Sequence, residues 1–182
     1  MKSISIGLLG LSLFFFACGK NTDTSTSKKP PTKNSEVNTQ NPHYPELVDF
    51  SWNENGQEKK LSDFKGKVIL LNFWATWCPP CKREFPDLSS IARDLDGKDF
   101  KIIGISVDEQ PGAMESYLKA NSLPYTVIHE QGDLLGKYMS VTGGDQNVIP
   151  QTFIIDKKGR VVETLIGSRS KQDFLSLINK YL

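Results

Sequence analysis

The chain has 182 residues, with 22 Lys and Arg against 21 Asp and Glu, and 38% of its residues are hydrophobic. This length suits one folded domain with short attachments. Because the charge is nearly balanced, the composition gives no electrostatic reason for binding nucleic acid or an anionic membrane surface. The three cysteines, one of which lies near the N-terminus, are too few for a fold held together by disulfides.

The N-terminal segment has the pattern of a bacterial lipoprotein signal. Lys2 precedes an apolar run over residues 4–17, which is too short to span a bilayer comfortably and matches the hydrophobic region of a secretory signal. The run ends in FFACGK and resembles a lipobox, in which signal peptidase II cleaves before a cysteine that is then lipidated; Phe15 stands where Leu is usual. This resemblance implies a signal peptide over residues 1–17 and a lipidated Cys18. The alternative is a secretory signal in which Cys18 is incidental.

Residues 18–43 are interpreted as the lipidated N-terminus and a disordered tether. After Cys18 the segment is rich in Ser, Thr, Asn, Lys and Pro and has almost no apolar residues. It cannot bury enough surface to offset the entropy of ordering. His43, at its end, is interpreted as a solvated linker residue. A folded domain is therefore expected over residues 44–182.

A β-hairpin is expected at the start of the folded domain. Two strand-like segments, residues 47–52 and 57–61, flank Asn-Gly at positions 55–56, a dipeptide typical of tight hairpin turns. A short turn or helix over residues 62–66 leads to an unbroken apolar run, residues 68–74. Such a run is typical of a strand buried on both faces, as in a parallel or mixed sheet.

Two cysteines follow this strand at the start of a predicted helix. Cys78 suits the N-cap because Pro79 and Pro80 then occupy the first two helical positions, where a missing N–H costs nothing. The helix dipole and the remaining backbone N–H of Cys81 favour a thiolate on Cys78. Cys81 lies on the same helix face, at a separation that a disulfide can span. We therefore expect Cys78 to be the exposed nucleophile and Cys81 the more buried resolving thiol.

Helices and strands alternate through the rest of the chain. The helix that begins with the cysteines is expected over residues 79–95, with a kink at Pro86, which lacks a backbone donor. The later elements are strand 101–107, helix 112–121, strand 125–129, helix 134–139, strands 152–156 and 160–166, and helix 171–182. An apolar stripe along the last helix is formed by Phe174, Leu175, Ile178 and Leu182. This order indicates an α/β fold of modest size.

Two motifs within this series of strands and helices resemble those of the thioredoxin superfamily. They are WATWCPPCK, directly after a hydrophobic strand, and VIPQTFIID, later in the chain. The N-terminal hairpin, the KREFP continuation and a helix-strand insert after Val107 are similar to the extracytoplasmic branch of TlpA- and ResA-like thiol-disulfide oxidoreductases. The resemblance covers residues 44–182. It implies a thioredoxin-like α/β fold with a central mixed β-sheet flanked by helices, extended by the hairpin and the insert.

The resemblance also assigns substrate-binding residues. Pro150, preceded by Ile149, matches the cis-proline that faces the active cysteines in this superfamily. Backbone groups near Ile149 would then hold an extended segment of a partner protein, as in a short strand addition. Trp77 would form an exposed contact surface. The alternatives are a trans proline that opens a strand and, for Trp77, ordinary packing.

Asn72 and Glu84 bear on proton transfer. By resemblance, Asn72 stands where thioredoxins proper have a buried aspartate, so a titrating group is absent there. Glu84, one helical turn after Cys81, matches the acidic residue of ResA-like proteins. A partly buried carboxyl there would have a raised pKa and could exchange protons with Cys81. The alternative is a solvated glutamate on the helix surface.

These features predict a protein-disulfide reductase of the cell envelope. Cys78 would attack a partner disulfide and Cys81 would resolve the mixed disulfide, without a diffusible cofactor. No metal is expected, because zinc needs about four ligands and His43 and His129 lack ligand spacing to the pair. The resemblance implies disulfide-containing clients, with apocytochrome c as one candidate. It also implies a membrane electron donor of the DsbD or CcdA kind and a lipid-anchored location outside the cytoplasm. We expect a monomer.

Other functions stay open. A peroxiredoxin-like peroxidase shares the scaffold and the neighbourhood of Val107 and Asp108, but such enzymes place a proline and a threonine where Leu71 and Ala75 stand here. A copper-handling lipoprotein would use the two active cysteines as soft ligands. A purely structural disulfide is disfavoured, because closing so short a loop removes little entropy from the unfolded chain.

Overall fold

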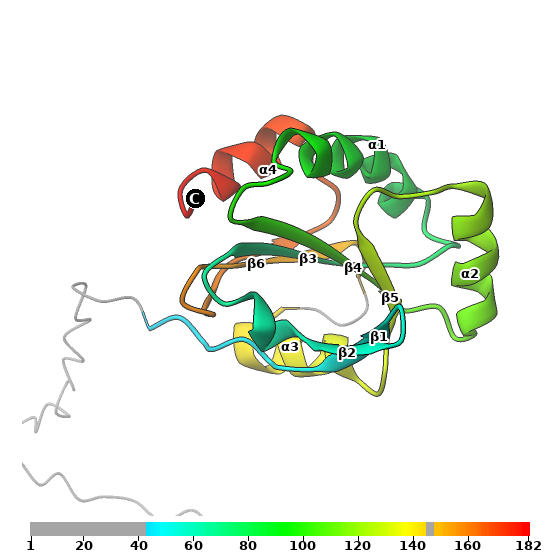
Figure 1. Ribbon diagram of the computed structural model, residues 1–182, viewed down its shortest axis with the longest axis horizontal. Coiled ribbons are helices and arrows are strands. Elements are labelled where there is room, and N and C mark those ends of the chain that lie inside the picture. The colour runs from blue at the N-terminus through cyan, green and yellow to red at the C-terminus, as the bar shows by residue number, and fades with distance from the viewer. Residues whose placement is uncertain (1–42, 145–147) are drawn as a thin grey trace, which may run out of the picture. The chain divides into compact units, whose positions relative to one another are not determined.

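A computed structural model of the chain describes residues 43–144 and 148–182 (Figure 1). The predicted signal peptide, Cys18 and the tether up to residue 42 lie outside the described residues, so they stay predictions. No helix within the described ranges combines the length and hydrophobicity that crossing a membrane requires.

A mixed sheet of five strands forms the middle layer of the described residues, in the order β5-β4-β3-β6-β7. The central strand β3 (Val68–Trp74) runs parallel to β4 (Phe100–Ser106) and antiparallel to β6 (Gln151–Ile155). Outside these, β5 (Thr126–His129) pairs with β4 and β7 (Val161–Ile166) pairs with β6. Every residue of β3 is buried, as its apolar run predicts.

Helices cover both faces of this sheet (Figure 1). One face carries α1 (Pro79–Asp94) and α4 (Lys171–Ile178), and the other carries α3 (Leu134–Thr142) together with the N-terminal hairpin. The remaining helix, α2 (Pro111–Ala120), precedes β5 and lies at that end of the sheet (Figure 1). It forms the predicted helix-strand insert with β5, so the expected α/β architecture is confirmed.

The alternation of side chains along β3 supplies both core layers. Val68 and Leu70 pack in one hydrophobic cluster with residues of α1 and α4, including Phe174. Leu71 and Phe73 belong to the opposite cluster, with residues of α3 and the hairpin. The strand is therefore held from both faces, and its C-terminal end delivers the following turn to a fixed place.

The N-terminal hairpin consists of β1 (Ser51–Glu54) and β2 (Gln57–Lys60), followed by the short 3-10 helix η1 (Leu61–Phe64). Asn55 and Gly56 have φ of 53° and 80°, the left-handed values that a tight hairpin turn of this type requires. The first strand begins at Ser51 and not at residue 47. The preceding residues instead contact the β6–β7 turn: Leu47 N–H donates to the carbonyl of Gly159 at 2.8 Å.

Two helices differ in length from the prediction. The helix predicted over residues 134–139 continues to Thr142 and ends at Gly143, whose left-handed φ of 74° makes it a C-cap. The last helix stops at Ile178 instead of continuing to Leu182, because the final residues form turns. Leu182 is 36% exposed and does not complete the predicted buried stripe. By contrast, α1 runs through Pro86 and ends at Asp94, one residue before the predicted end. The kink at Pro86 stays a prediction.

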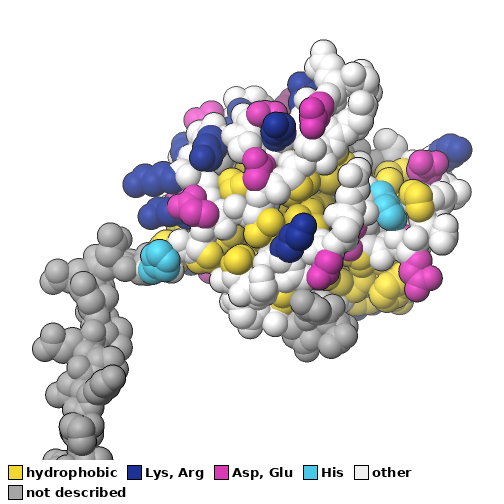
Figure 2. Space-filling model, turned by 90° about the horizontal axis from the view of Figure 1, so that it is seen from below, with side chains coloured by type: hydrophobic (Ala, Val, Ile, Leu, Met, Phe, Trp, Pro, Cys, Tyr) yellow, Lys and Arg dark blue, Asp and Glu magenta, His cyan; other side chains and the backbone are white. Residues whose placement is uncertain are grey.

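Charges of both signs share the molecular surface. On the face seen in Figure 2, Lys and Arg side chains lie among Asp and Glu side chains, and hydrophobic side chains show between them. This distribution agrees with the balanced composition, in which 22 basic residues face 21 acidic ones.

Candidate active site

The two cysteines form a disulfide at the N-terminus of α1. Cys78 is the N-cap, with Pro79 and Pro80 in the first helical turn, and the backbone N–H of Cys81 donates to Cys78 Sγ at 3.2 Å. The sulfurs are bonded at 1.97 Å with the Cα atoms 5.4 Å apart. The predicted cap is thus confirmed, and its remaining donor points at the sulfur that would carry the thiolate.

The exposure of Cys78 differs from the prediction. Cys78 is 3% exposed and Cys81 is fully buried, so Cys81 is the more buried of the two, but Cys78 is not exposed in this disulfide form. The reason is that Cys78 Sγ is covered by its partner sulfur and by the carbonyl oxygen of Ile149, 3.8 Å away. Trp77, directly before Cys78, is 65% exposed.

The loop before β6 faces the disulfide. The Ile149–Pro150 peptide bond is cis, so the predicted cis-proline is confirmed. The loop reaches this place because β6 lies beside β3, with Gln151 paired to Phe73. Ile149 packs against the hydrophobic cluster that contains both cysteines.

Glu84 is a buried carboxyl on α1, only 2% exposed. Its Oε1 accepts from the backbone N–H of Arg169 at 2.7 Å, and its Oε2 accepts from Asn72 Nδ2 at 3.5 Å. Asn72 also donates to Thr152 Oγ1 at 3.0 Å. Burial raises the pKa of Glu84 to about 7, against the opposing effect of the Arg169 hydrogen bond. The alternative of a solvated glutamate is therefore wrong, and the predicted raised pKa is confirmed.

Asp108 fixes the turn that leads to Cys78, a role that sequence reasoning missed. This buried carboxylate accepts from the backbone N–H of Thr76 at 3.1 Å, from the Thr76 hydroxyl at 2.7 Å and from the Ser106 hydroxyl at 2.6 Å. It therefore ties the end of β4 to the β3–α1 turn. The available signal was an aspartate just after a buried strand parallel to β3.

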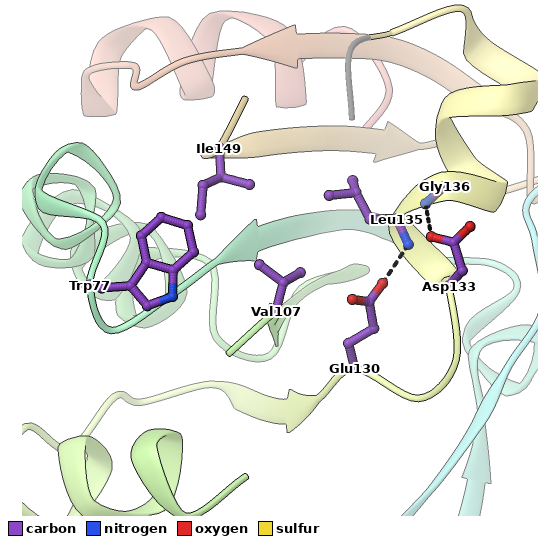
Figure 3. Close-up of a pocket in the computed structure, with 7 residues that line it drawn as sticks. All are labelled: Trp77, Val107, Glu130, Asp133, Leu135, Gly136 and Ile149. Atoms are coloured by element: carbon purple, nitrogen blue, oxygen red, sulfur yellow. Dashed lines mark hydrogen bonds between the residues drawn. The ribbon is translucent and has the colours of Figure 1, made fainter. Parts of the chain in front are cut away.

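A pocket of about 390 Å³ (Figure 3) shares Ile149 with the disulfide site, since the Ile149 carbonyl oxygen lies 3.8 Å from Cys78 Sγ. Its lining residues are Trp77, Val107, Glu130, Asp133, Leu135, Gly136 and Ile149. Trp77 and Ile149 were predicted as substrate-binding residues, whereas the members from the β5–α3 connection were not. That connection carries no motif, and it reaches the site only because β5 pairs with β4.

Metal-binding side chains do not gather elsewhere in the described ranges. Among residues 43–144 and 148–182, no group of three or more His, Cys, Asp or Glu side chains could hold a metal ion. His43 is exposed, and His129 Nε2 lies 2.6 Å from the carbonyl oxygen of Asp108.

Comparisons with known proteins point to one chemistry. Residues 43–164 match the AhpC/TSA family. The chain is 33% identical to the thiol-disulfide oxidoreductase ResA of Bacillus cereus over 126 residues, 69% of each protein. It is similar to the crystal structure of a thioredoxin-family thiol:disulfide interchange protein from Chlorobium tepidum, with a TM-score of 0.69, 31% identity, and coverage of 78% of this chain and 98% of that one. This similarity confirms the thioredoxin-like fold.

A second solved structure is also similar to this chain. The exposed lipoprotein thioredoxin of Streptococcus pneumoniae matches with a TM-score of 0.61 and 27% identity, over 73% of this chain and 99% of that one.

Proposed function

The chain belongs to the AhpC/TSA family and is a thioredoxin-fold thiol-disulfide oxidoreductase related to ResA, and on this premise we propose that it reduces disulfides of client proteins outside the cytoplasm. The observation that carries the proposal is the Cys78–Cys81 disulfide at the capped N-terminus of α1, beside the Ile149 carbonyl. A disulfide in this position is reactive because the helix start stabilises the thiolate that its reduction produces.

The reaction takes place in two exchange steps. In the reduced protein, the Cys78 thiolate attacks one sulfur of a client disulfide, that S–S bond breaks, and the other client sulfur leaves as a thiolate. The Cys81 thiolate then attacks Cys78 Sγ and releases the second client thiolate. The client gains two electrons and, as its thiolates protonate, two protons. The protein is left with the Cys78–Cys81 disulfide, and the dithiol needs no diffusible cofactor.

Glu84 is proposed to exchange the proton of Cys81. It lies one turn after Cys81 on the same helix, and its pKa of about 7 leaves it able to hold or release a proton near neutral pH. Asn72, which contacts Glu84, cannot titrate, so it orients the carboxyl without competing for the proton.

The client would lie along the exposed edge formed by Trp77 and Ile149. The Ile149 carbonyl would accept a backbone hydrogen bond from an extended client segment, and Trp77 would pack against it. This arrangement agrees with the exposure of the Trp77 side chain and with the nearness of Ile149 to Cys78.

The place of action is proposed to be the cell envelope, where the lipidated Cys18 anchors a monomer to a membrane. The apolar run before Cys18 and the similarity to an exposed lipoprotein thioredoxin support this location. Since the compartment is oxidising, the disulfide needs a dedicated source of electrons. We propose a membrane thiol transporter of the DsbD or CcdA kind, and apocytochrome c among the clients.

A trapping experiment tests the function. Cys81→Ser keeps the attacking thiol but removes the resolving one, so client proteins should accumulate on Cys78 as mixed disulfides that thiol reductants release. The double variant Cys78→Ser, Cys81→Ser is the matched control and should trap nothing. Recovery of cytochromes through their haem-site cysteines would support the narrower role in cytochrome c maturation.

Two further measurements separate the other functions. Peroxide consumption by the reduced protein with an external dithiol, faster than its reduction of protein disulfides, would favour a peroxidase. About one equivalent of copper on freshly purified protein would favour a copper-handling role. Either result, together with an absence of trapped clients, would contradict the reductase proposal.

A further inference from the structure

The pocket beside the disulfide, here called the Trp77 pocket, has apolar walls and an acidic end. Figure 3 shows Trp77 and Ile149 on one side, Val107 between, and the carboxylates of Glu130 and Asp133 on the other side. Its volume of about 390 Å³ lies within the range of about 300–1,000 Å³ that is usual for ligand pockets. The pocket is thus large enough to take one or two side chains of a bound polypeptide.

The position of the Trp77 pocket couples it to the redox pair. Trp77 directly precedes Cys78, and Ile149 places its carbonyl oxygen 3.8 Å from Cys78 Sγ. A client strand that pairs with the backbone at Ile149 and presents its cysteine to Cys78 sends neighbouring side chains to alternate sides. A side chain close to the target cysteine in the client sequence therefore reaches the pocket.

The acidic end is built by the start of α3. Glu130 Oε1 accepts from the backbone N–H of Leu135 at 2.6 Å, and Asp133 Oδ1 accepts from that of Gly136 at 3.1 Å (Figure 3). Gly136 leaves the space that the Asp133 carboxylate occupies, since a Cβ there would collide with it. Glu130 also accepts from the backbone N–H of Leu134. A carboxylate has about four lone-pair sites, so both groups can still accept from a further donor.

The charge at this end is incompletely compensated. Within the described part of the chain, neither carboxylate forms an ion pair with a Lys or Arg side chain. The N-terminus of α3 offsets part of the charge. Burial, and to a smaller degree the neighbouring charge of Asp133, raise the pKa of Glu130. A cation bound at the acidic end of the pocket would relieve the repulsion between the two carboxylates.

We propose that the Trp77 pocket is a subsite for a lysine or arginine side chain of the client, close in sequence to the cysteine that Cys78 attacks. This inference rests on the proposed function and adds a substrate class to it. A long cationic side chain matches the pocket because its methylene stem packs on Trp77, Val107 and Ile149 while its charged head reaches Glu130 and Asp133. An acidic side chain is repelled there, and a purely apolar one adds no cationic partner for the carboxylates.

Synthetic disulfide peptides test the subsite. Each peptide carries one disulfide, with Lys, norleucine or Glu placed in turn at the two positions on either side of the target cysteine. The full chain with Cys18→Ser is reduced, freed of reductant and mixed with each peptide, and the second-order rate constant of peptide reduction is measured. At one or more positions we expect Lys to react about fivefold faster than Glu, the size of a partly exposed ion-pair effect, with norleucine between them.

The double variant Glu130→Gln, Asp133→Asn removes both charges. Each replacement keeps a carbonyl oxygen for its backbone donor, and Asn is a good N-cap, so α3 keeps its start. The Lys-over-Glu ratio should fall to about one. Both rate constants in this ratio are measured on the same protein sample, so a partial loss of activity changes them equally and leaves the ratio unchanged. The control Glu58→Gln, Glu115→Gln removes two exposed carboxylates outside the pocket and should keep the ratio.

The outcomes separate the subsite from the function. Equal reduction rates for the Lys and Glu peptides at every position would overturn the subsite. A Lys preference that persists in the Glu130→Gln, Asp133→Asn variant would overturn it as well. Both conclusions hold even if the protein reduces these peptides and small aromatic disulfides. Failure to reduce any of them would overturn the proposed function as well.

Discussion

Glu84 shows how the protein interior sets the chemistry of one residue. Its carboxyl receives one backbone and one amide hydrogen bond, yet burial outweighs both and raises its pKa to about 7. With few charges to compensate it, the carboxylate form is costly, so the folded protein prefers the protonated acid near and below neutral pH. Such a group suits proton exchange with a neighbouring thiol.

A pH-dependent stability follows from Glu84. Its pKa rises from 4.5 in the unfolded chain to about 7 in the folded protein, so the folded state binds this proton more tightly. The stabilisation is complete below pH 4.5 and is lost as the pH rises through 7. The difference in unfolding free energy between the wild type and the Glu84→Gln variant should therefore change with pH. Relative to the variant, the wild type should lose on the order of 2 kcal/mol between about pH 5 and pH 8. Urea unfolding of the oxidised proteins measures this difference.

The control for Glu84 is Glu115→Gln, an exposed carboxylate on α2, whose difference from wild type should not change in this way. The rate of disulfide reduction tests the proton role itself: Glu84→Gln should lose the inflection near pH 7. An unchanged pH profile would leave Glu84 a structural residue only.

The two thiols should differ in reactivity. In the disulfide form Cys78 is the N-cap, with the Cys81 N–H directed at its sulfur, and Cys81 is the more buried of the two. We expect the reduced protein to keep this cap and this order of burial. Alkylation at neutral pH should therefore modify Cys78 at least tenfold faster than Cys81, because only the thiolate reacts and it must be reached by the reagent. Peptide mapping after brief labelling measures the ratio. Faster labelling of Cys81 would reverse the assigned roles.

Among the elements, we expect the start of α1 to set the redox potential. Pro79 and Pro80 remove two backbone donors from the helix start, and no His or Arg lies between the cysteines. The thiolate of Cys78 is thus stabilised only moderately, which favours the disulfide. Equilibration with redox buffers should give a potential far below the about −120 mV of a DsbA-type oxidant. A value close to that of DsbA would indicate a disulfide-forming role.

A substitution at Pro80 tests the same cause. Pro80→His places an imidazole beside Cys78, and the protonated imidazole is positively charged. It should raise the reduction potential of the disulfide by about 30 mV, since stabilising the thiolate makes the disulfide more oxidising. Pro80→Ala is the matched control, because it restores the backbone donor without adding charge. Equal potentials for the two variants would show that charge has no part in the poise.

The β3–α1 turn depends on Asp108. Asp108→Asn replaces one carboxylate oxygen by an amide that cannot accept from Thr76 or Ser106. Because three donors converge on this buried carboxylate, the change should lower the unfolding free energy by about 1–3 kcal/mol. Thr76→Val, which removes one hydroxyl donor, should cost less. Urea unfolding measures the stability of both variants. An unchanged unfolding free energy for Asp108→Asn would show that other contacts hold the turn.

At the scale of the whole molecule, the described residues belong to one compact unit. Several hydrogen bonds hold its N-terminal edge in place. The Val161 N–H donates to the Pro45 carbonyl at 2.8 Å, and the Leu47 N–H donates to the Gly159 carbonyl. The Tyr138 hydroxyl donates to the Val48 carbonyl. These contacts show that residues 45–48 belong to the folded unit, and the boundary close to residue 44 stays a prediction.

A truncation tests this boundary. A chain starting at Tyr44 should fold and reduce disulfides like the full chain, whereas one starting at Ser51 should be less stable, because it loses the contacts of residues 45–48. Thermal unfolding and disulfide reduction measure both chains. In cells, Cys18→Ser should give unprocessed or soluble protein instead of a lipid-anchored one. Loss of folding in the chain from Tyr44 would show that the N-terminal segment is more than a tether.

The features that local interactions control could be predicted from the amino-acid sequence. The apolar run of β3, the Asn-Gly hairpin turn and the Cys78 cap with two prolines each depend on residues close together in the chain, where periodicity, φ preference and capping leave few alternatives. The cis-proline followed from its flanking residues, which resemble those of the superfamily.

The surroundings of these elements could not be predicted, because they depend on contacts between distant parts of the chain. The partners of Glu84 come from β3 and from the segment before α4, Asp108 reaches the turn because β4 lies beside β3, and the Trp77 pocket is completed by Glu130 after β5. The covering of Cys78 by Ile149 has the same origin. These contacts join residues far apart in the chain, so they depend on the order of strands in the sheet, which no local pattern of side chains specifies.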